Sequence, residues 1–551
     1  METGIGETGI GDTETWETET WETEAGWWRR PGDVAAVAVL IGLPILVFGL
    51  PALLGHAVLP GDDMTQNFPL RVLAGREIRA GRLPLFDPYA WSGSALLAGW
   101  NAGAAYPLTW LFAVLPGIAA WTAGLIITWA TAGVSLYCFL RAVRLAPLPS
   151  FGGAMTFALA GAMSAQIIHF GLVAGMSWVP LALLAVLRLS EGSSRTDRGA
   201  SPLPSRLGSS RRRLRWTAVL AVAVGLMMLA GEPRAITDGC VIIGLYAAWR
   251  VARLGLWRQA APLIALGCLL GGLLGAVQWL PGLAAVSTSQ RGSGSMALFS
   301  DGSLAPKWLA LTLVPDLLGG SGSLSQPKFF GGYNLTEVTS YVGVLPLIAA
   351  FALLARAVSA MVRRRGVPDW FIWHVQAVVG IVLALGGDSP LGPVLYHVPL
   401  LGGQRLQSRN ILLLDLALAI LLAYWLQAPF RKPPGRAARA ETLVALIPPL
   451  GILILVVLGQ TWGAGLLRWL GISAGKSGQV IGQLQPWLIP YAVLAVTATA
   501  LVVFGRRLGR RGWARACAGF VVTDIVVFTV MAVVSVAPSG SAAVPHPPSA
   551  A

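Results

Sequence analysis

The sequence predicts an all-α polytopic membrane protein with about 13 transmembrane helices. Hydrophobic residues make up 55% of the 551 positions, whereas Asp, Glu, Lys and Arg together make up only 12%. That charged share is about half of what soluble domains carry. The mean hydropathy is +0.67, and apolar runs recur from about residue 33 to residue 537. These observations exclude an ordinary soluble globule and a globally disordered chain.

Each predicted helix is an apolar segment that approaches the ~20 residues needed to cross a bilayer. The 13 segments lie near residues 33–54, 118–140, 151–167, 171–188, 216–231, 235–250, 260–281, 340–360, 369–386, 411–428, 441–459, 485–504 and 516–537. Segment 106–116 is apolar but short and bounded by proline, so we expect an interfacial or re-entrant helix there. The four cysteines are scattered singly, which predicts neither a disulfide framework nor a zinc site.

The basic residues orient these segments. The net charge of +15 comes mainly from arginine, which supplies 36 of the 40 basic residues, mostly in short loops. This pattern is typical of cytoplasmic loops and does not indicate a nucleic-acid partner. A cytoplasmic N-terminus places 28 of the 40 basic residues in the cytoplasm. The long loops 55–105, 282–339, 387–410 and 460–484 then lie outside, where we expect any chemistry.

The chain also divides by composition. Residues 1–30 are acidic and repetitive, which predicts a disordered low-complexity tail. Residues 31–430 form the transmembrane core, and residues 431–537 add further C-terminal transmembrane helices. Residues 538–551 predict a second disordered tail. The Ser/Pro/Gly-rich loop 189–215 is typical of a flexible cytoplasmic linker.

The first outer loop, residues 61–107, concentrates charge. Asp62 and Asp63 follow the first span directly, and Arg71, Arg76, Arg79 and Arg82 lie on the side where arginine is disfavoured. Proline favours the first turn of a helix, so we expect a helix from Pro69. Arg71 and Arg79 would then project within about 80° of each other. Such an amphipathic helix would lie on the membrane surface.

Two interpretations of this loop stay open. In the first, the arginines extend to lipid headgroups and pair with the acids. In the second, a carboxylate lies beside cations that hold a lipid-linked phosphate. The planar fork of arginine binds two phosphate oxygens at once, and a carboxylate accepts the proton of an attacking hydroxyl.

Four motifs in order resemble a known family over about residues 33–430. They are Asp62–Gln66, the group Gly81–Tyr89 with Gly93 and Tyr106–Pro107, the segment EVTSYVGVLPL at 337–347, and ALGGDSPLGPVLYHVPLL at 384–401. Arg405 and Arg409 follow an Arg-x-Pro-x-Arg pattern in which Gln407 replaces the proline. The chain resembles the bacterial YfhO-like membrane proteins of the GT-C superfamily, which are polyprenyl-phosphate-sugar glycosyltransferases.

The resemblance implies a GT-C-like core with interfacial helices in the first outer loop. It implies an enzyme that moves a sugar from a polyprenyl-phosphate carrier to a cell-envelope glycan or lipid on the extracytoplasmic side. The general base would be Asp62 or Asp63, and the spacing of four to Gln66 favours Asp62. Candidate substrate-binding residues are Gln66, Arg71, Arg79, Tyr89, Glu232, Arg234, Glu337, Tyr341, Arg405 and Arg409.

Some of these candidates also have structural interpretations. Glu232 and Arg234 could cap a helical turn and pair, or bind the acceptor. Glu337 could belong to the site, or could be favoured as a charge at a helix N-terminus. His169 and His397 lie at the outer face, where a lone histidine is more often structural than catalytic.

Three acids fall within or near the ends of predicted spans. Asp238 and Asp415 lie near the outer boundary, where pairing with arginine is as good an interpretation as a functional role, and Asp524 has no evident partner.

No metal site is predicted, and a divalent cation stays open. Motifs for nucleotide, hydrolase-triad or zinc-protease chemistry are not found. The alternative functions are a transporter or flippase, or a non-catalytic scaffold, for lipid-linked saccharides. Transporters often carry internal repeats, and we see none.

Overall fold

The computed structural model describes residues 30–90, 92–159, 161–191, 206–289, 294–320, 322, 326–427 and 436–528. The tail predicted at 1–30, apart from Arg30, lies outside these residues. So do the tail at 538–551, most of the predicted linker 189–215 and the end of the last predicted span.

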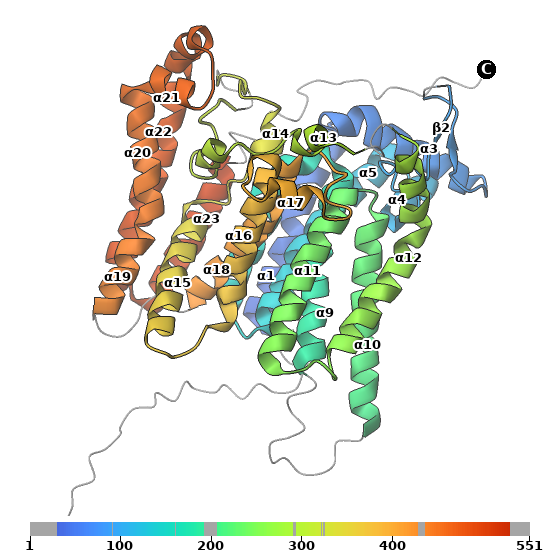
Figure 1. Ribbon diagram of the computed structural model, residues 1–551, viewed down its shortest axis with the longest axis horizontal. Helices are drawn as coiled ribbons and strands as arrows, with labels where there is room; N and C mark the ends of the chain where they lie inside the picture. The colour runs from blue at the N-terminus through green and yellow to red at the C-terminus, as the bar shows by residue number, and fades with distance from the viewer. Residues whose placement is uncertain are drawn as a thin grey trace, which may run out of the picture.

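Long helices lie side by side with similar directions and make up most of the molecule (Figure 1). Among the described residues, 11 helical segments are long and apolar enough to cross a membrane. They are built from α1 (Pro31–Pro44) with α2 (Leu50–Leu53), α5 (Gly117–Ala142), α6 (Pro147–Leu159) with α7 (Gly161–Ala165), α8 (Phe170–Met176) with α9 (Val179–Glu191), α11 (Pro233–Leu254), α12 (Ala261–Ser287), α15 (Val344–Val362), α16 (Ile372–Leu385), α18 (Leu412–Gln427), α19 (Arg436–Ala445) with α20 (Ile447–Thr461), and α22 (Ala474–Phe504). The predicted all-α polytopic class is therefore confirmed.

Two further helices occupy the remaining predicted positions. α10 (Arg206–Leu229) covers most of segment 216–231, and α23 (Gly509–Phe528) covers the first part of 516–537. The first ten residues of α10 include five arginines, and α23 carries three arginines and Asp524. Because of these charges, neither helix counts among the 11 spans by composition, and the total of 13 stays a prediction.

Small residues let two of the helices approach closely. Gly267, Gly271 and Gly275 of α12 recur every four residues and face Leu220, Val224 and Met228 of α10. A side chain at any of the three glycines would collide with α10. Small residues at this spacing are a common means of packing helices in a membrane. The opposite side of α12 exposes leucines, among them Leu269 and Leu273, which suits a hydrocarbon environment.

The shorter elements gather at one end of the helical bundle, the upper end in Figure 1. They include the π-helical turn η3 (Asp63–Asn67), α3 (Phe68–Arg79), α4 (Pro107–Val114), α13 (Met296–Ser300), α14 (Leu335–Val338), α17 (Gly392–Tyr396), the 3-10 turn η8 (Gln407–Ile411) and α21 (Gly463–Trp469). The remaining short turns are η2 (Ile45–Gly49), η4 (Gln166–Ile168), η5 (Pro306–Thr312), η6 (Asp369–Phe371), η7 (Gly386–Asp388) and η9 (Gly505–Leu508).

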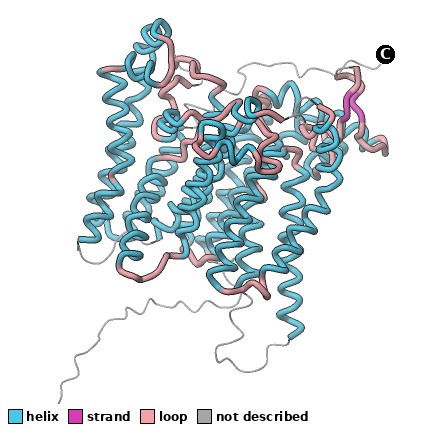
Figure 2. The backbone as a smooth tube through the Cα atoms, in the orientation of Figure 1, coloured by secondary structure: helices cyan, strands magenta, loops and turns pink. Residues whose placement is uncertain are grey.

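The first outer loop is built as two short helices and a hairpin. α3 begins one residue before the predicted Pro69, and α4 forms from the short apolar segment as expected. Strands β1 (Phe86–Asp87) and β2 (Ser94–Ala95) pair antiparallel, with Phe86 opposite Ala95. Figure 2 shows this hairpin at the edge of the loop-rich end. The loop-rich end therefore carries the two first-loop motifs, Asp62–Gln66 and Gly81–Tyr89.

Candidate functional site

The two adjacent aspartates of the first loop point into different surroundings. The side chain of Asp63 is fully buried. Its Oδ1 accepts hydrogen bonds from Asn67 Nδ2 at 2.6 Å and from the backbone N–H of Phe170 at 3.4 Å. The side chain of Asp62 is 54% exposed. Only Asp62 is therefore accessible to a substrate.

The pKa values of the two carboxyls separate in opposite directions. Burial raises the pKa of Asp63 to about 7, although the bonds from Asn67 and Phe170 oppose the shift. Contact with His169 lowers the pKa of Asp62, burial opposes this effect, and the nearby charge of Arg409 adds to the lowering. Near neutral pH, Asp62 is therefore an ionised, accessible carboxylate.

A second pair, Arg409 and Glu337, is a buried ion pair beside Asp62. Arg409 of η8 donates from Nε to Glu337 Oε2 at 2.8 Å and from Nη2 to Glu337 Oε1 at 2.6 Å. Asn334 caps α14 by accepting the backbone N–H of Glu337 at 3.1 Å. Burial raises the pKa of Glu337, but the bonds and charge of Arg409 outweigh burial, and the pKa of Glu337 is lowered overall. Both members of the pair are therefore charged.

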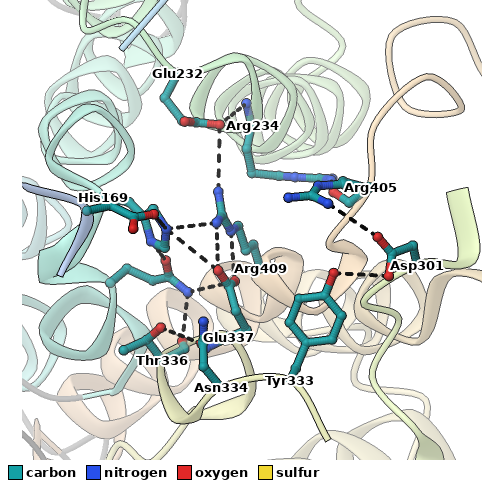
Figure 3. A network of polar contacts seen from close by, with 12 residues as sticks. His169, Glu232, Arg234, Asp301, Tyr333, Asn334, Thr336, Glu337, Arg405 and Arg409 are labelled. Atoms are coloured by element: carbon teal, nitrogen blue, oxygen red, sulfur yellow. Dashed lines mark hydrogen bonds and ion pairs between the residues drawn. The ribbon is translucent and has the colours of Figure 1, made fainter. Parts of the chain in front are cut away.

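His169 connects the pair to Asp62. It lies between η4 and α8, and its Nε2 is 3.6 Å from Asp62 Oδ2 and 3.7 Å from Glu337 Oε1. The same nitrogen is 3.0 Å from Arg409 Nη2. On the other side of the ring, Nδ1 is 2.6 Å from Gln166 Oε1. Figure 3 shows the imidazole against Arg409 and Glu337.

The turn between α10 and α11 closes a third side. Glu232 caps α11 by accepting the Arg234 N–H at 3.4 Å, and its Oε1 is 4.0 Å from Arg409 Nη1. Gly231 has φ +88°, and a Cβ there would lie 2.9 Å from the Cα of Gly103 in the first loop. Glycine therefore permits the close approach that brings Glu232 to the site.

Arg234 is a buried organiser of the neighbouring segment. Its Nη1 donates to Gln407 Oε1 and to Asn410 Oδ1, each at 3.1 Å, and its Nη2 donates to the Arg405 carbonyl at 2.7 Å. The predicted cap by Glu232 is confirmed, whereas the guanidinium of Arg234 bonds the segment 405–410 instead of the Glu232 carboxylate. Because it is 2% exposed, Arg234 does not offer its charge to a substrate.

Arg405 is the exposed cation of the site. Its side chain is 45% exposed, and Nη1 is 3.5 Å from Asp301 Oδ2. Tyr333 donates its hydroxyl to the other oxygen of Asp301 at 3.0 Å. The next residue, Leu406, has a left-handed φ of +63°, and its N–H donates to the Asp301 carbonyl at 2.7 Å. Backbone strain of this kind persists only where surrounding contacts hold it, as Asp301 and Arg234 do here.

Several predicted site residues lie elsewhere. Gln66 accepts a bond from Asn101 Nδ2 at 3.0 Å. Arg79 donates from Nε to the Ala113 carbonyl at 2.6 Å. The side chain of Tyr89 is 71% exposed on the hairpin. Tyr341 is buried, and its hydroxyl donates to Asp524 Oδ1 at 2.7 Å.

Arg71 also lies outside the exposed site. Its guanidinium is fully buried, donates to the Thr109 hydroxyl and to the Ala230 carbonyl, and lies 4.6 Å from the ring centroid of Phe170. The interpretation that this arginine extends to lipid headgroups is wrong, because α3 packs Arg71 inward against α4 and the α10–α11 turn. Arg76 and Arg79, on the same helix, are exposed.

The intramembrane acids have mostly local partners. Asp415 accepts the Ala162 N–H at 2.6 Å and the Ser340 hydroxyl at 2.8 Å, so no arginine is needed to explain it. Asp524 also accepts the Val344 N–H at 2.8 Å. Asp238 is buried, and its Oδ2 has no hydrogen-bond partner within the described residues.

The sequence predicted no site role for Gln166, Asp301 or Tyr333, and it favoured a structural role for His169. The position of His169 between two spans at the same boundary as Asp62 was the available signal. His397 is exposed beside Tyr396 and takes no part in the network. Among the described residues, no group of three or more His, Cys, Asp or Glu side chains is arranged to hold a metal ion.

No family model matches the chain, and no curated protein matches it. Two solved structures have a similar arrangement. ArnT from Cupriavidus metallidurans, bound to undecaprenyl phosphate, is similar over 91% of this chain and 76% of its own, with a TM-score of 0.45 and 15% identity. The oligosaccharyltransferase AglB from Archaeoglobus fulgidus, in complex with an inhibitory peptide and a dolichol-phosphate, is similar over 78% of this chain and 56% of its own, with a TM-score of 0.37 and 13% identity. At these values the likeness says nothing of the reaction, and membership of the YfhO-like family stays a prediction.

Proposed function

We propose that this protein is an integral membrane glycosyltransferase of GT-C type. It moves a sugar from a polyprenyl-phosphate carrier to a cell-envelope acceptor on the extracytoplasmic side. The observation that supports the proposal best is the position of Asp62. Its accessible, ionised carboxylate lies beside His169 and Arg409 at the loop-rich end of the bundle.

The chemistry assigns each group a task. Asp62 accepts the proton of the acceptor hydroxyl while the acceptor oxygen bonds to the anomeric carbon of the sugar. The bond from that carbon to the phosphate oxygen breaks, and the electron pair leaves with the lipid phosphate. Arg405 is exposed and has one long contact with Asp301, so its guanidinium is available to stabilise the departing phosphate.

Arg409 has a different task. Its Nε and Nη2 are engaged by Glu337, Nη2 also faces His169, and Nη1 lies near Glu232. With these donors engaged, Arg409 organises the carboxylates around Asp62 and leaves the phosphate to Arg405. Of the two arginines that the sequence offered as candidate substrate-binding residues, this division keeps Arg405 for the phosphate.

The orientation also belongs to the proposal. The loop-rich end faces the outside, and the N-terminus lies in the cytoplasm. The opposite end of the bundle supports this because its connections carry basic residues, among them Arg363, Arg364 and Arg365. In a cysteine-free background and intact cells, we expect a membrane-impermeant maleimide to label Tyr89→Cys but not Arg364→Cys, both exposed positions. The reverse labelling would overturn the orientation.

The enzyme is tested by two neutral substitutions of the adjacent acids. Purified protein in proteoliposomes receives radiolabelled undecaprenyl-phosphate sugars, together with envelope lipids and glycans as acceptors. We expect Asp62→Asn to lower kcat by about 100-fold or more, the usual effect of losing a general base. Asp63→Asn serves as the matched control and stays within about threefold, because Asp63 is buried. Full transfer by Asp62→Asn would remove Asp62 from the mechanism. Passage of the lipid-linked sugar across the bilayer without a new glycosidic bond would support the transporter instead.

The phosphate role is tested by donor binding. We expect Arg405→Ala to weaken binding of undecaprenyl phosphate by about 10-fold to 100-fold, since a hydrogen bond to a charged group contributes about 1.5–3 kcal/mol. Arg76→Ala removes an exposed arginine of α3 at the same end of the bundle and is expected to leave the affinity within twofold. Equal affinity of wild type and Arg405→Ala would remove Arg405 from the site.

A further inference from the structure

We propose that His169 receives the proton that Asp62 takes from the acceptor hydroxyl, so that the two residues form a proton relay. The inference rests on the proposed function and adds to it a residue with a defined tautomer. His169 does not touch the substrate in this scheme. It acts through Asp62 and is therefore a positioning residue for the proton.

The hydrogen bonds of Gln166 determine which ring nitrogen of His169 carries the proton. Its Nε2 donates to the Thr336 carbonyl at 2.7 Å and lies 3.3 Å from Glu337 Oε2. Both partners are acceptors, so the amide oxygen of Gln166 must be the atom that faces His169 Nδ1 at 2.6 Å. An oxygen can only accept, and Nδ1 therefore carries a hydrogen.

This tautomer leaves a lone pair, and no hydrogen, on the ring nitrogen that lies near Asp62. In a neutral imidazole only one nitrogen is protonated, so Nε2 is unprotonated. It accepts a hydrogen bond from Arg409 Nη2 at 3.0 Å and lies 3.6 Å from Asp62 Oδ2. The base that can receive a proton from Asp62 is thus in place before the reaction begins. Without the contact to Gln166, the ring could flip or adopt the other tautomer.

Charged groups from several segments surround Nε2 and its neighbour Arg409. Asp62 from the first loop faces Nε2. Glu337 of α14 and Arg409 of η8 also face it, and Glu232 from the α10–α11 turn adjoins Arg409 (Figure 3). Three carboxylates thus surround a single guanidinium. The carboxylates of Asp62 and Glu337 lie 3.6 and 3.7 Å from Nε2, close enough to interact with a proton held there. When Nε2 takes up a proton, its hydrogen bond from Arg409 Nη2 is lost. Arg409 still keeps its two bonds to Glu337.

The proton has a complete path. The acceptor O–H bond breaks and the hydrogen passes to Asp62 Oδ2, while the sugar moves from the phosphate oxygen to the acceptor oxygen. Asp62 Oδ2 lies 3.6 Å from His169 Nε2, so the protonated carboxyl faces a nitrogen that can accept its proton. His169 Nε2 takes it, and the imidazolium then releases it to water or to the departing lipid phosphate. Asp62 is ionised again for the next acceptor.

Kinetics test the relay in full-length protein. We expect His169→Gln to lower kcat about 10-fold to 100-fold with KM within twofold, and to remove the acidic limb of the pH profile of kcat. Added imidazole should restore part of the activity of His169→Ala, which a purely structural role would not allow. His397→Gln, at an exposed histidine of the same end, is the matched control with unchanged kcat. A His169→Gln enzyme with wild-type kcat and pH profile would overturn the relay.

A second measurement needs no substrate. Solid-state 15N NMR of protein labelled in its histidine side chains reports which ring nitrogen is protonated, and the His169 signal is the one lost in His169→Gln. We expect the Nδ1–H form at high pH. The Nε2–H form would overturn the relay whatever the transfer assay shows. Absence of transfer by wild type, with Nδ1–H observed, would instead overturn the proposed function and leave the arrangement of the ring intact.

Discussion

Arg409 and Glu337 are joined by two hydrogen bonds of 2.8 and 2.6 Å, although 72 positions separate them in the chain. The pair ties α14 to η8 and forms the floor on which His169 lies. Removing one member of a buried ion pair leaves an uncompensated charge, whereas removing both can be nearly neutral. The pair therefore has a measurable structural role apart from any reaction.

We expect Glu337→Gln to lower the free energy of unfolding by about 3 kcal/mol, because it leaves the Arg409 guanidinium buried without its carboxylate. Reversible unfolding in mixed detergent micelles measures the change. The double variant Glu337→Gln with Arg409→Gln should recover part of the loss. A single variant as stable as wild type would show that the pair is not needed for folding.

Asp63 should make stability depend on pH. Its folded pKa of about 7 lies above the unfolded value near 3.8. The contribution of Asp63 to the free energy of unfolding is therefore fully present below about pH 4 and is lost as pH rises through about 7. A difference of this size between the folded and unfolded pKa corresponds to about 4 kcal/mol. We expect wild type to lose stability relative to Asp63→Asn between pH 4 and 8, measured by unfolding at each pH. Asp62→Asn is the control of opposite sign, because the lowered pKa of Asp62 stabilises at high pH. Parallel curves for wild type and Asp63→Asn would contradict the burial of Asp63.

Arg71 should matter for folding and not for donor binding. Burial lowers its pKa to about 10, so it stays charged at neutral pH while bonded to Thr109 and Ala230. We expect Arg71→Met to lower the free energy of unfolding by about 3 kcal/mol, as loss of bonds to a charged group does. Arg76→Ala, at an exposed position, should change it by less than about 0.5 kcal/mol. Undecaprenyl phosphate affinity should stay within twofold in folded Arg71→Met, and a large loss there would return Arg71 to the binding site.

Tyr341 should likewise act in the core. Its hydroxyl donates to Asp524, and its ring lies 5.7 Å from that of Tyr491. Tyr341→Phe leaves one oxygen of a buried carboxyl without its donor, so we expect a loss of about 1–3 kcal/mol in unfolding free energy. The exposed Tyr89→Phe is the matched control and should be neutral. Changed donor affinity with unchanged stability in Tyr341→Phe would favour the substrate-binding role that the sequence motif suggested.

Local patterns predicted a large part of the architecture. Apolar length located the spans, and proline at the start of a helix located α3 to within one residue. The short, proline-bounded segment became α4. These features depend on near neighbours along the chain, which is why they can be read from it. The interpretation in which the first-loop arginines extend to lipid headgroups was wrong for Arg71, since the helical period gives the face of a residue but not what packs against that face.

By itself, the sequence determined a membrane-embedded helical protein whose long loops carry Asp62, Asp63, Glu337 and several arginines. Only the tertiary structure decided that Asp62 is accessible and Asp63 buried, that Arg405 is exposed while Arg409 is engaged, and that His169 lies between them. The physical reason is that exposure, tautomer and pKa depend on which segments meet. The site draws on residues 62–63, 166–169, 232–234, 301, 333–337 and 405–410, and no local pattern states which of these segments will be neighbours.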